Sequence, residues 1–178
     1  MPHKIETRRL ELILLTTSLI DDLLAGRRQE AQVEGGFVMP SNWPDEHDSA
    51  FLRMRREQIR ADPQTEVWLA RAMVASEDPS RSMIGHIGFH GPPREGTLEM
   101  GYTIFPAHRR RGHACEAAAG MMDWAMREHG IRKFILSISP DNTPSLAVAE
   151  RLGFQRTGEQ WDEEDGLEWV FELIREGD

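Results

Sequence analysis

Cysteine, tyrosine and long hydrophobic runs are nearly absent from this sequence of 178 residues. Cys115 is its one cysteine, which excludes an internal disulfide, and the residues around it lack the spacing of metal ligands. No apolar stretch approaches the roughly 18 residues that span a bilayer, and no charged start leads into the core of a signal peptide. We therefore expect a cytoplasmic protein that binds no metal and has no membrane partner.

Positive charge is also in short supply. Asp and Glu number 30 against 21 Lys and Arg, which gives a formal net charge of -9. A field of this sign repels phosphate backbones, so we expect no nucleic acid among the partners. The two standard nucleotide loops, Gly-x-x-x-x-Gly-Lys-Ser/Thr and Gly-x-Gly-x-x-Gly, are missing as well.

The chain does contain alternating strand and helix patterns, without repeats or a domain boundary. Its length allows one domain that buries roughly 70% of the unfolded surface. We predict a single domain over residues 1–178 of mixed α/β class. Strands are predicted at residues 10–14, 66–74, 82–89, 97–104, 134–138, 154–161 and 167–174.

The intervening segments carry helix and turn signals. Helices are predicted from Thr16 to near Arg28, from Asp48 to before Pro63, over 114–129, and from Asn142 to Gly153, with a loop at 35–44. Turns at 77–80 and 91–96 predict that the three strands between residues 66 and 104 form an antiparallel meander, and Asp165-Gly166 predicts a hairpin.

Three consecutive arginines, Arg109 to Arg111, stand before Gly112 in this acidic chain. They lie between a predicted strand and a predicted helix, where free N–H groups and the helix dipole converge on an anion. Gly112 has no side chain, so the backbone can approach a bound anion closely, and the small side chain of Ala114 leaves room at the first helical turn. The alternative is a solvated run of surface arginines. The position favours a phosphate site.

Residues 109–114, RRRGHA, resemble the Arg/Gln-x-x-Gly-x-Gly/Ala signature of the GCN5-related N-acetyltransferase (GNAT) superfamily. The likeness extends to its RimJ/RimL-like branch of ribosomal-protein N-terminal acetyltransferases through residues 6–12, Glu116, 141–145 and 150–154. It implies the GNAT fold, a mostly antiparallel sheet of six to seven strands, splayed between its fourth and fifth strands and covered by helices on both faces.

The same resemblance implies acetyl-coenzyme A as cosubstrate, with no metal, and a primary amine that attacks the thioester directly. The acceptor would be a protein or peptide N-terminus or a small-molecule amine. The implied cofactor-binding residues are the pyrophosphate cradle and the pantetheine contacts on the fourth strand and at the last helix, namely Arg109, Arg110, Arg111, Gly112, His113, Ala114, Ile104, Phe105, Asn142 and Ser145. Free backbone N–H groups are expected between Tyr102 and Phe105.

Candidate catalytic residues follow from the same comparison. Glu99 occupies a strand position where many GNAT enzymes keep the base that draws the amine proton; a solvent-facing or salt-bridged glutamate is the alternative. His86 and His90 are alternatives, because a histidine side chain in general titrates near neutral pH, and a structural role is the other explanation for each. Ser145 could serve the leaving thiolate or bond backbone in the first helical turn.

Other site residues have simpler explanations. N-capping accounts for Asn142, with or without a pantetheine contact. Ala149 stands where many members of the resembled family carry a tyrosine that protonates the leaving thiolate, and Tyr102 is the one tyrosine of the chain. Protonation of the thiolate would therefore depend on Ser145 or water. Cys115 fits a small buried filler better than a nucleophile, although a helix N-terminus can lower the pKa of a thiol.

Two other functions are compatible with these features. The chain could be a noncatalytic module that binds acyl-coenzyme A, or the arginines could bind nucleic acid, which the net charge opposes. The sequence leaves the amine, the acyl length and the oligomeric state open, and it allows a homodimer.

Overall fold

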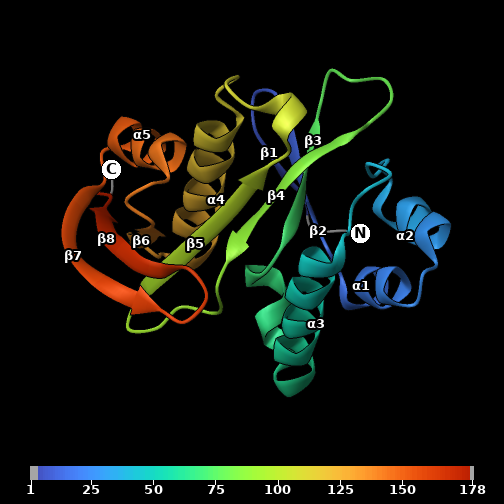
Figure 1. Cartoon of the computed structure of the whole chain (residues 1–178), viewed down its shortest axis with the longest axis horizontal. Helices are drawn as coiled ribbons and strands as arrows, with labels where there is room; N and C mark the ends of the chain where they lie inside the picture. The colour runs from blue at the N-terminus through green and yellow to red at the C-terminus, as the bar shows by residue number, and fades with distance from the viewer. Residues whose placement is uncertain (1–3, 177–178) are drawn as a thin grey trace.

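One sheet of eight strands forms the body of this computed structural model, which describes residues 4–176. The order across the sheet is β1-β2-β3-β4-β5-β6-β8-β7, and every neighbouring pair is antiparallel except β5 and β6 (Figure 1). The strands are β1 (Lys4–Glu6), β2 (Leu10–Leu14), β3 (Arg71–Ala75), β4 (Met83–Phe89), β5 (Thr97–Ile104), β6 (Lys133–Ile138), β7 (Gln155–Asp162) and β8 (Gly166–Ile174).

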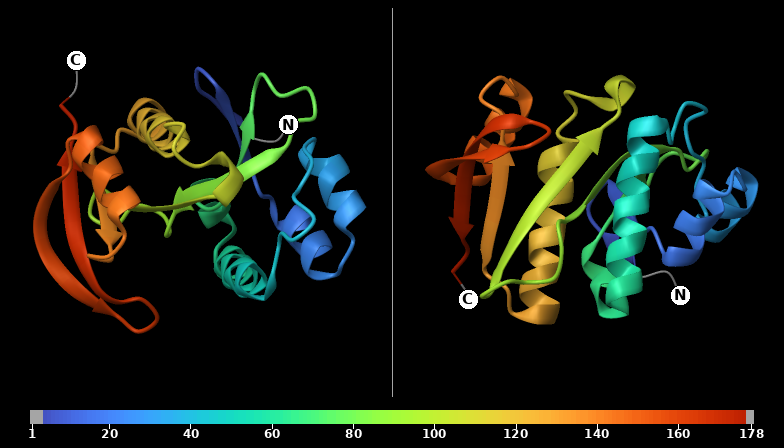
Figure 2. Two further views of the ribbon diagram at one scale, coloured as in Figure 1. Left: turned by 45° about the horizontal axis from the view of Figure 1, so that its top comes forward. Right: turned by 60° about the horizontal axis from the view of Figure 1, so that its bottom comes forward.

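Helices cover both faces of the sheet. They are α1 (Thr17–Leu24), α2 (Arg28–Gly35), α3 (Glu46–Ala61), α4 (His113–His129) and α5 (Thr143–Leu152), with short 3-10 helices at Pro63–Trp68 and Pro106–His108. Figure 2 shows α3 and α4 on opposite sides of β4 and β5. Two separate groups of buried side chains fill the spaces, one under α4 and α5 and one under α1 to α3. The mixed α/β fold with helices on both faces, predicted above, is confirmed.

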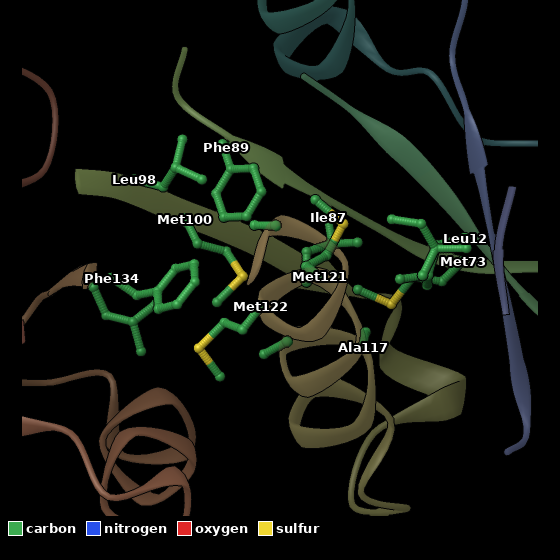
Figure 3. Packing of buried hydrophobic residues seen from close by; sticks show 14 of the residues in the cluster. Leu12, Met73, Ile87, Phe89, Leu98, Met100, Ala117, Met121, Met122 and Phe134 are labelled. Atoms are coloured by element: carbon green, nitrogen blue, oxygen red, sulfur yellow. The ribbon is translucent and has the colours of Figure 1, made fainter. Parts of the chain in front are cut away.

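Alternate side chains of β5 belong to the core under α4 and α5. Leu98 and Met100 point toward α4, where they meet Met121 and Met122 of that helix and Phe134 of β6 (Figure 3). All five are at most 2% exposed. Burying one such side chain contributes about 1.5–3 kcal/mol relative to exposure, so this layer fixes β5 against α4. The residues between them, including Glu99, face the opposite side.

Three elements differ from the sequence-based predictions. Residues 66–68 form part of a 3-10 helix instead of strand, because Pro63 starts a turn that the Asp62 side chain caps by accepting from the Gln64 N–H. The predicted helix from Thr16 to near Arg28 is the shorter α1, which is followed by Gly26 with a φ of +76°, and α2 from Arg28 to Gly35 was not predicted. Lys4–Glu6 adds an eighth strand to the expected six or seven, by pairing with β2.

The remaining predictions of secondary structure hold. The strands β3, β4 and β5 form the expected antiparallel meander, and β7 and β8 form a hairpin that turns at Gly166, whose φ is +76°. The helix predicted over 114–129 is α4, and it ends at Gly130 in the left-handed conformation.

The strands β5 and β6 separate soon after they meet. They pair in parallel over three positions, Thr97 to Glu99 on β5, and no pairing follows along the rest of β5 within the described chain. β6 continues instead against β8, as far as the pair Ile138 and Trp169. β5 remains bound to β4 up to Ile104. The predicted splay between these two strands is therefore present, and the sites described next lie along it.

Candidate active site

The separation of β5 from β6 leaves a cavity of about 210 Å³. Its walls come from β5, β6, the start of α5 and the β7–β8 hairpin: Met100, Gly101, Tyr102, Leu136, Ser137, Ile138, Ser139, Asn142, Ser145, Asp165 and Glu168. Two carboxylates, Asp165 and Glu168, stand on the hairpin side, while hydroxyl and amide groups line the side of α5. The cavity thus offers different chemistry at its two sides.

Backbone N–H groups of β5 face the gap beyond the last β5–β6 pair. The N–H of Phe105 donates to the carbonyl of Ile84 at 2.9 Å, so it is turned toward β4. Because successive N–H groups of a strand point to opposite sides, those of Tyr102 and Ile104 point toward the gap. The expectation of a free N–H at Phe105 was wrong, since β4 extends its pairing by one residue; the free groups lie at Tyr102 and Ile104.

The arginine loop brings free amides to the start of α4. Arg110 and Gly112 have positive φ values of 61° and 77°, and α4 begins after Gly112 without a side-chain cap. Within residues 4–176, the backbone N–H groups from Arg110 to Cys115 have no hydrogen-bond acceptor. Such unpaired donors at a helix N-terminus, with the positive end of the helix dipole, attract an anion.

The guanidinium groups of the loop are not neutralised by the protein. Arg110 and Arg111 are exposed, and no carboxylate in the described chain forms an ion pair with them or with Arg109. Arg109 is held differently from its neighbours, because its Nε donates to the Ile104 carbonyl at 2.9 Å. That bond ties the loop to the end of β5, beside the gap. The loop therefore combines free amides with uncompensated positive charge.

A clamp from the N-terminal segment holds this loop in place. Glu116 accepts from the Thr7 hydroxyl at 2.7 Å and from the Arg9 backbone N–H and Nε at 2.6 Å each. Arg9 also donates through a terminal nitrogen to the carbonyl of Arg111 at 3.0 Å. Burial works against the Glu116 carboxylate, but these hydrogen bonds outweigh it and lower its pKa.

Glu99 is held on the opposite side of β5 from the α4 core. The Ser137 hydroxyl donates to its Oε1 at 2.7 Å, and the Nδ1 of His90 lies 3.6 Å from the same oxygen. The His90 contact is the largest cause of a lowered pKa of Glu99, and burial opposes it. Glu99 is therefore an ionised carboxylate at neutral pH, next to the cavity through Ser137.

The two histidines of this region have different surroundings. His86 lies among the rings of Phe51, Trp43 and Phe105, at centroid distances of 5.3, 6.3 and 6.4 Å. Burial lowers the pKa of His86 to about 4, with a further contribution from Arg55. His86 lies among these rings and not in the cavity wall, so Glu99 is the better placed of the two candidate bases. His90 is exposed and serves Glu99.

The start of α5 presents Asn142 and Ser145 to the cavity. Asn142 is the N-cap, and its side-chain oxygen accepts from the Ser145 N–H at 3.2 Å, as predicted. The Ser145 hydroxyl bonds no backbone group in the described chain and lines the cavity. Ala149, one turn further along, is fully buried.

Comparison with known proteins identifies the fold. The family profile described as an acetyltransferase (GNAT) domain matches residues 9–155. The chain belongs to the GNAT acetyltransferase family. Members of this family use acetyl-coenzyme A, and the chain is accordingly an acetyltransferase.

Two curated relatives and one solved structure show the range of GNAT proteins that this chain is similar to. The uncharacterized N-acetyltransferase YjdG of Bacillus subtilis is 28% identical over 153 residues, which cover 84% of this chain and 88% of that protein. Aminoglycoside N(6')-acetyltransferase type 1 of Salmonella typhimurium is 28% identical over 116 residues, 65% of this chain and 79% of that protein. The RimL ribosomal α-N-protein acetyltransferase, in complex with coenzyme A, shares the fold with a TM-score of 0.66 at 18% identity, over 99% of this chain and 100% of that one.

Several contacts of the site residues could not be predicted from the sequence. Ser137 and His90 become partners of Glu99 only through strand register, and Arg9 reaches the arginine loop across 102 positions of sequence. The pKa of Cys115 is raised by burial, which agrees with a packing role and not with a nucleophile. Trp43 is buried at 3% exposure in the core beneath α1 to α3, so it does not stand free in its loop.

Other absences can be stated for the described part of the chain. Among residues 4–176 no group of three or more His, Cys, Asp or Glu residues is placed to hold a metal ion. Nor does any helix in that range have the length and apolar character needed to cross a bilayer.

Proposed function

We propose that this GNAT enzyme moves the acetyl group of acetyl-coenzyme A onto a primary amine by direct attack. The observation that carries the proposal is the set of unpaired amides from Arg110 to Cys115, which lies at the same end of β5 as the open edge of that strand. The diphosphate of coenzyme A matches the charge and donors of the loop. A noncatalytic binder would have no need for the half-buried carboxylate of Glu99 beside the cavity.

The proposed placement of the cosubstrate uses the predicted residues with one change. Arg110, Arg111 and the amides from Gly112 to Ala114 would hold the diphosphate, and Arg109 would steady the loop while its terminal nitrogens stay available. Pantetheine would then lie along the open edge of β5, bonding to the N–H groups of Tyr102 and Ile104, with Asn142 and Ser145 on its other side. Phe105 would contribute only through its position at the end of the strand.

Glu99 is the proposed proton acceptor for the amine. Its lowered pKa keeps it ionised, and the Ser137 hydroxyl that it accepts from lines the cavity. Proton transfer through an intervening water is the route that this geometry favours, because Glu99 itself stands behind Ser137. Asp165 and Glu168 on the cavity wall would attract the protonated form of an amine before it loses its proton.

The acceptor class is proposed as a cationic primary amine. The RimL neighbour acts on a ribosomal protein and the Salmonella relative on aminoglycosides, so amines of both sizes occur among similar proteins. The cytoplasmic location, the absence of nucleic acid and membrane partners, the single domain over residues 1–178 and a homodimer stay predictions.

The test follows free thiol released from acetyl-coenzyme A with a panel of peptides and small amines. We expect release above background hydrolysis with at least one amine, and a roughly hundredfold lower kcat for Glu99→Gln at unchanged coenzyme A affinity. Glu159→Gln, an exposed glutamate on β7, is the matched control and should behave like wild type. Tight binding of acetyl-coenzyme A without turnover on any amine would favour the noncatalytic module instead.

A further inference from the structure

The one tyrosine of the chain has a buried hydroxyl beside the Ser145 hydroxyl, without a completed hydrogen bond between the two. Tyr102 lies on β5 with its ring packed against the core under α4 and α5. Its phenolic oxygen is shielded from solvent, and no donor or acceptor within residues 4–176 completes a hydrogen bond to it. Buried hydroxyls are nearly always hydrogen-bonded, so an unpartnered one in a native structure calls for an explanation.

The surroundings of this hydroxyl belong to the cavity. Tyr102 and Ser145 are both in its walls, one from β5 and one from the first turn of α5. Burial raises the pKa of Tyr102, opposed by the Ser145 hydroxyl, and the Cys115 thiol of α4 raises it further. Three groups from three elements therefore converge beside the open edge of β5. The phenol keeps its proton at neutral pH, and Ser145 is the hydroxyl beside it.

At Ala149, the helix α5 has no group that could donate a proton to a leaving thiolate. That side chain is a fully buried methyl group, and the remaining hydroxyl of α5 near the cavity is Ser145. Ser145 is itself a poor acid, because an aliphatic hydroxyl holds its proton far more strongly than a phenol. The group with the better-matched acidity thus stands on the strand, across the gap from the helix.

We propose, on the basis of the acetyl-transfer function above, that the Tyr102 hydroxyl protonates the sulfur of coenzyme A as the thioester breaks. The amine nitrogen forms its bond to the acetyl carbon and gives up a proton toward Glu99. The carbon–sulfur bond then breaks with its electron pair on sulfur, and the phenol proton passes to that sulfur. Glu99 then releases its proton to water, and Ser145 relays a proton from solvent to the phenolate, so both groups return to their starting states with one thiol and one amide formed.

The kinetic test compares Tyr102→Phe with Ser145→Ala. We expect a roughly hundredfold loss of kcat for Tyr102→Phe, a KM for acetyl-coenzyme A within about threefold of wild type, and a smaller loss for Ser145→Ala. Folding should be intact in Tyr102→Phe, because the lost hydroxyl completes no hydrogen bond within residues 4–176 and only the contact with Ser145 changes. The reverse order of the two losses, or a Tyr102→Phe enzyme whose kcat stays within twofold of wild type, would overturn the proposal.

A second measurement does not depend on finding the acceptor. Because Tyr102 is the sole tyrosine, the absorbance of tyrosinate near 295 nm reports its ionisation alone. Coenzyme A should move the titration midpoint of the wild-type phenol upward, since a nearby thiolate accepts its hydrogen bond, whereas desulfo-coenzyme A should not. Equal midpoints with both ligands, at saturation, would show that phenol and sulfur do not meet, and would leave the acetyltransferase activity standing.

Discussion

At the scale of single residues, His86 shows how packing lowers the pKa of a histidine. Three aromatic rings and the Arg55 guanidinium surround the imidazole, and burial holds its pKa near 4. An unfolded histidine has a pKa of about 6.5. Below pH 6.5 this histidine binds a proton in the unfolded chain but stays neutral in the folded one. The free energy of unfolding therefore decreases as the pH falls. The whole effect develops between about pH 6.5 and pH 4.

The change His86→Phe should therefore make the protein less sensitive to acid. From this one group, the wild-type free energy of unfolding is expected to be about 2 kcal/mol lower at pH 5 than at pH 7. Urea unfolding at both pH values checks this, with the difference for the variant smaller by that amount. If the two proteins lost the same free energy between pH 7 and pH 5, His86 would not be buried as a neutral base.

Residue types alone gave part of this site and missed the rest. The arginine loop and Asn142 were predictable from the sequence, because each is a local feature of a strand end or a helix start, whereas Glu99 was proposed from the family resemblance. The roles of Ser137 and Tyr102 depend on which residues of β5, β6 and α5 come to face one gap. That information lies in strand register, and a one-residue slip would have sent Tyr102 to the other face.

At the scale of elements, the clamp made by Glu116 couples the first segment of the chain to the arginine loop. Arg9 bonds at once to Glu116 of α4 and to the carbonyl of Arg111, and a Cβ at Gly112 would lie 3.4 Å from its terminal nitrogen. The side chain of Glu116 is only 16% exposed, so its hydrogen bonds are partly shielded from water. The loop conformation depends on a segment more than 100 positions away.

Loss of the clamp should weaken coenzyme A binding without touching the ligand. For Arg9→Ala we expect the dissociation constant to rise about five- to tenfold, because the loop must be ordered on binding, and the unfolding free energy to fall by roughly 1.5–3 kcal/mol. Isothermal titration and urea unfolding measure the two effects. Arg9→Lys keeps the charge but cannot bridge both Glu116 and the Arg111 carbonyl. Its affinity for coenzyme A should therefore lie between those of wild type and Arg9→Ala. If Arg9→Lys matched wild type, charge alone would explain the role of Arg9.

Element boundaries were predictable where the turn chemistry was local. Gly130 and Gly166 stop or turn the chain by adopting positive φ, and both ends were read from the sequence. The 3-10 turn at residues 66–68 was not, because Val67 and Trp68 are typical strand residues. Besides the cap at Asp62, the packing of Trp68 against Trp124 and Phe89 accompanies the turn. β1 was missed because a strand of three residues carries too short a pattern.

At the scale of the whole molecule, a chain with a net charge of -9 must bind a ligand that is itself strongly negative. The long-range field opposes this encounter, and salt screens that field beyond about 10 Å. On the proposed placement the attraction is local, because three unneutralised guanidinium groups and the N-terminus of α4 would face the phosphates directly. The same arrangement explains why a basic loop in an acidic protein favours a compact anion over a long nucleic acid, whose distant phosphates would meet the acidic surface.

Coenzyme A bound at this loop should therefore stabilise the whole fold. Reversing the charge of a loop arginine at the N-terminal end of α4 should remove that stabilisation. At a coenzyme A concentration one hundred times the dissociation constant, wild type should gain about 2.7 kcal/mol, or roughly 5–10 °C in Tm for a chain of this size. Arg111→Glu at the same concentration should show little of that shift. Arg127→Glu makes the same charge change at the exposed C-terminal end of α4 and should keep the full shift relative to its own unliganded protein. Thermal unfolding with and without ligand measures all three proteins, and equal losses in the two variants would mean that net charge, and not the arginine loop, governs binding.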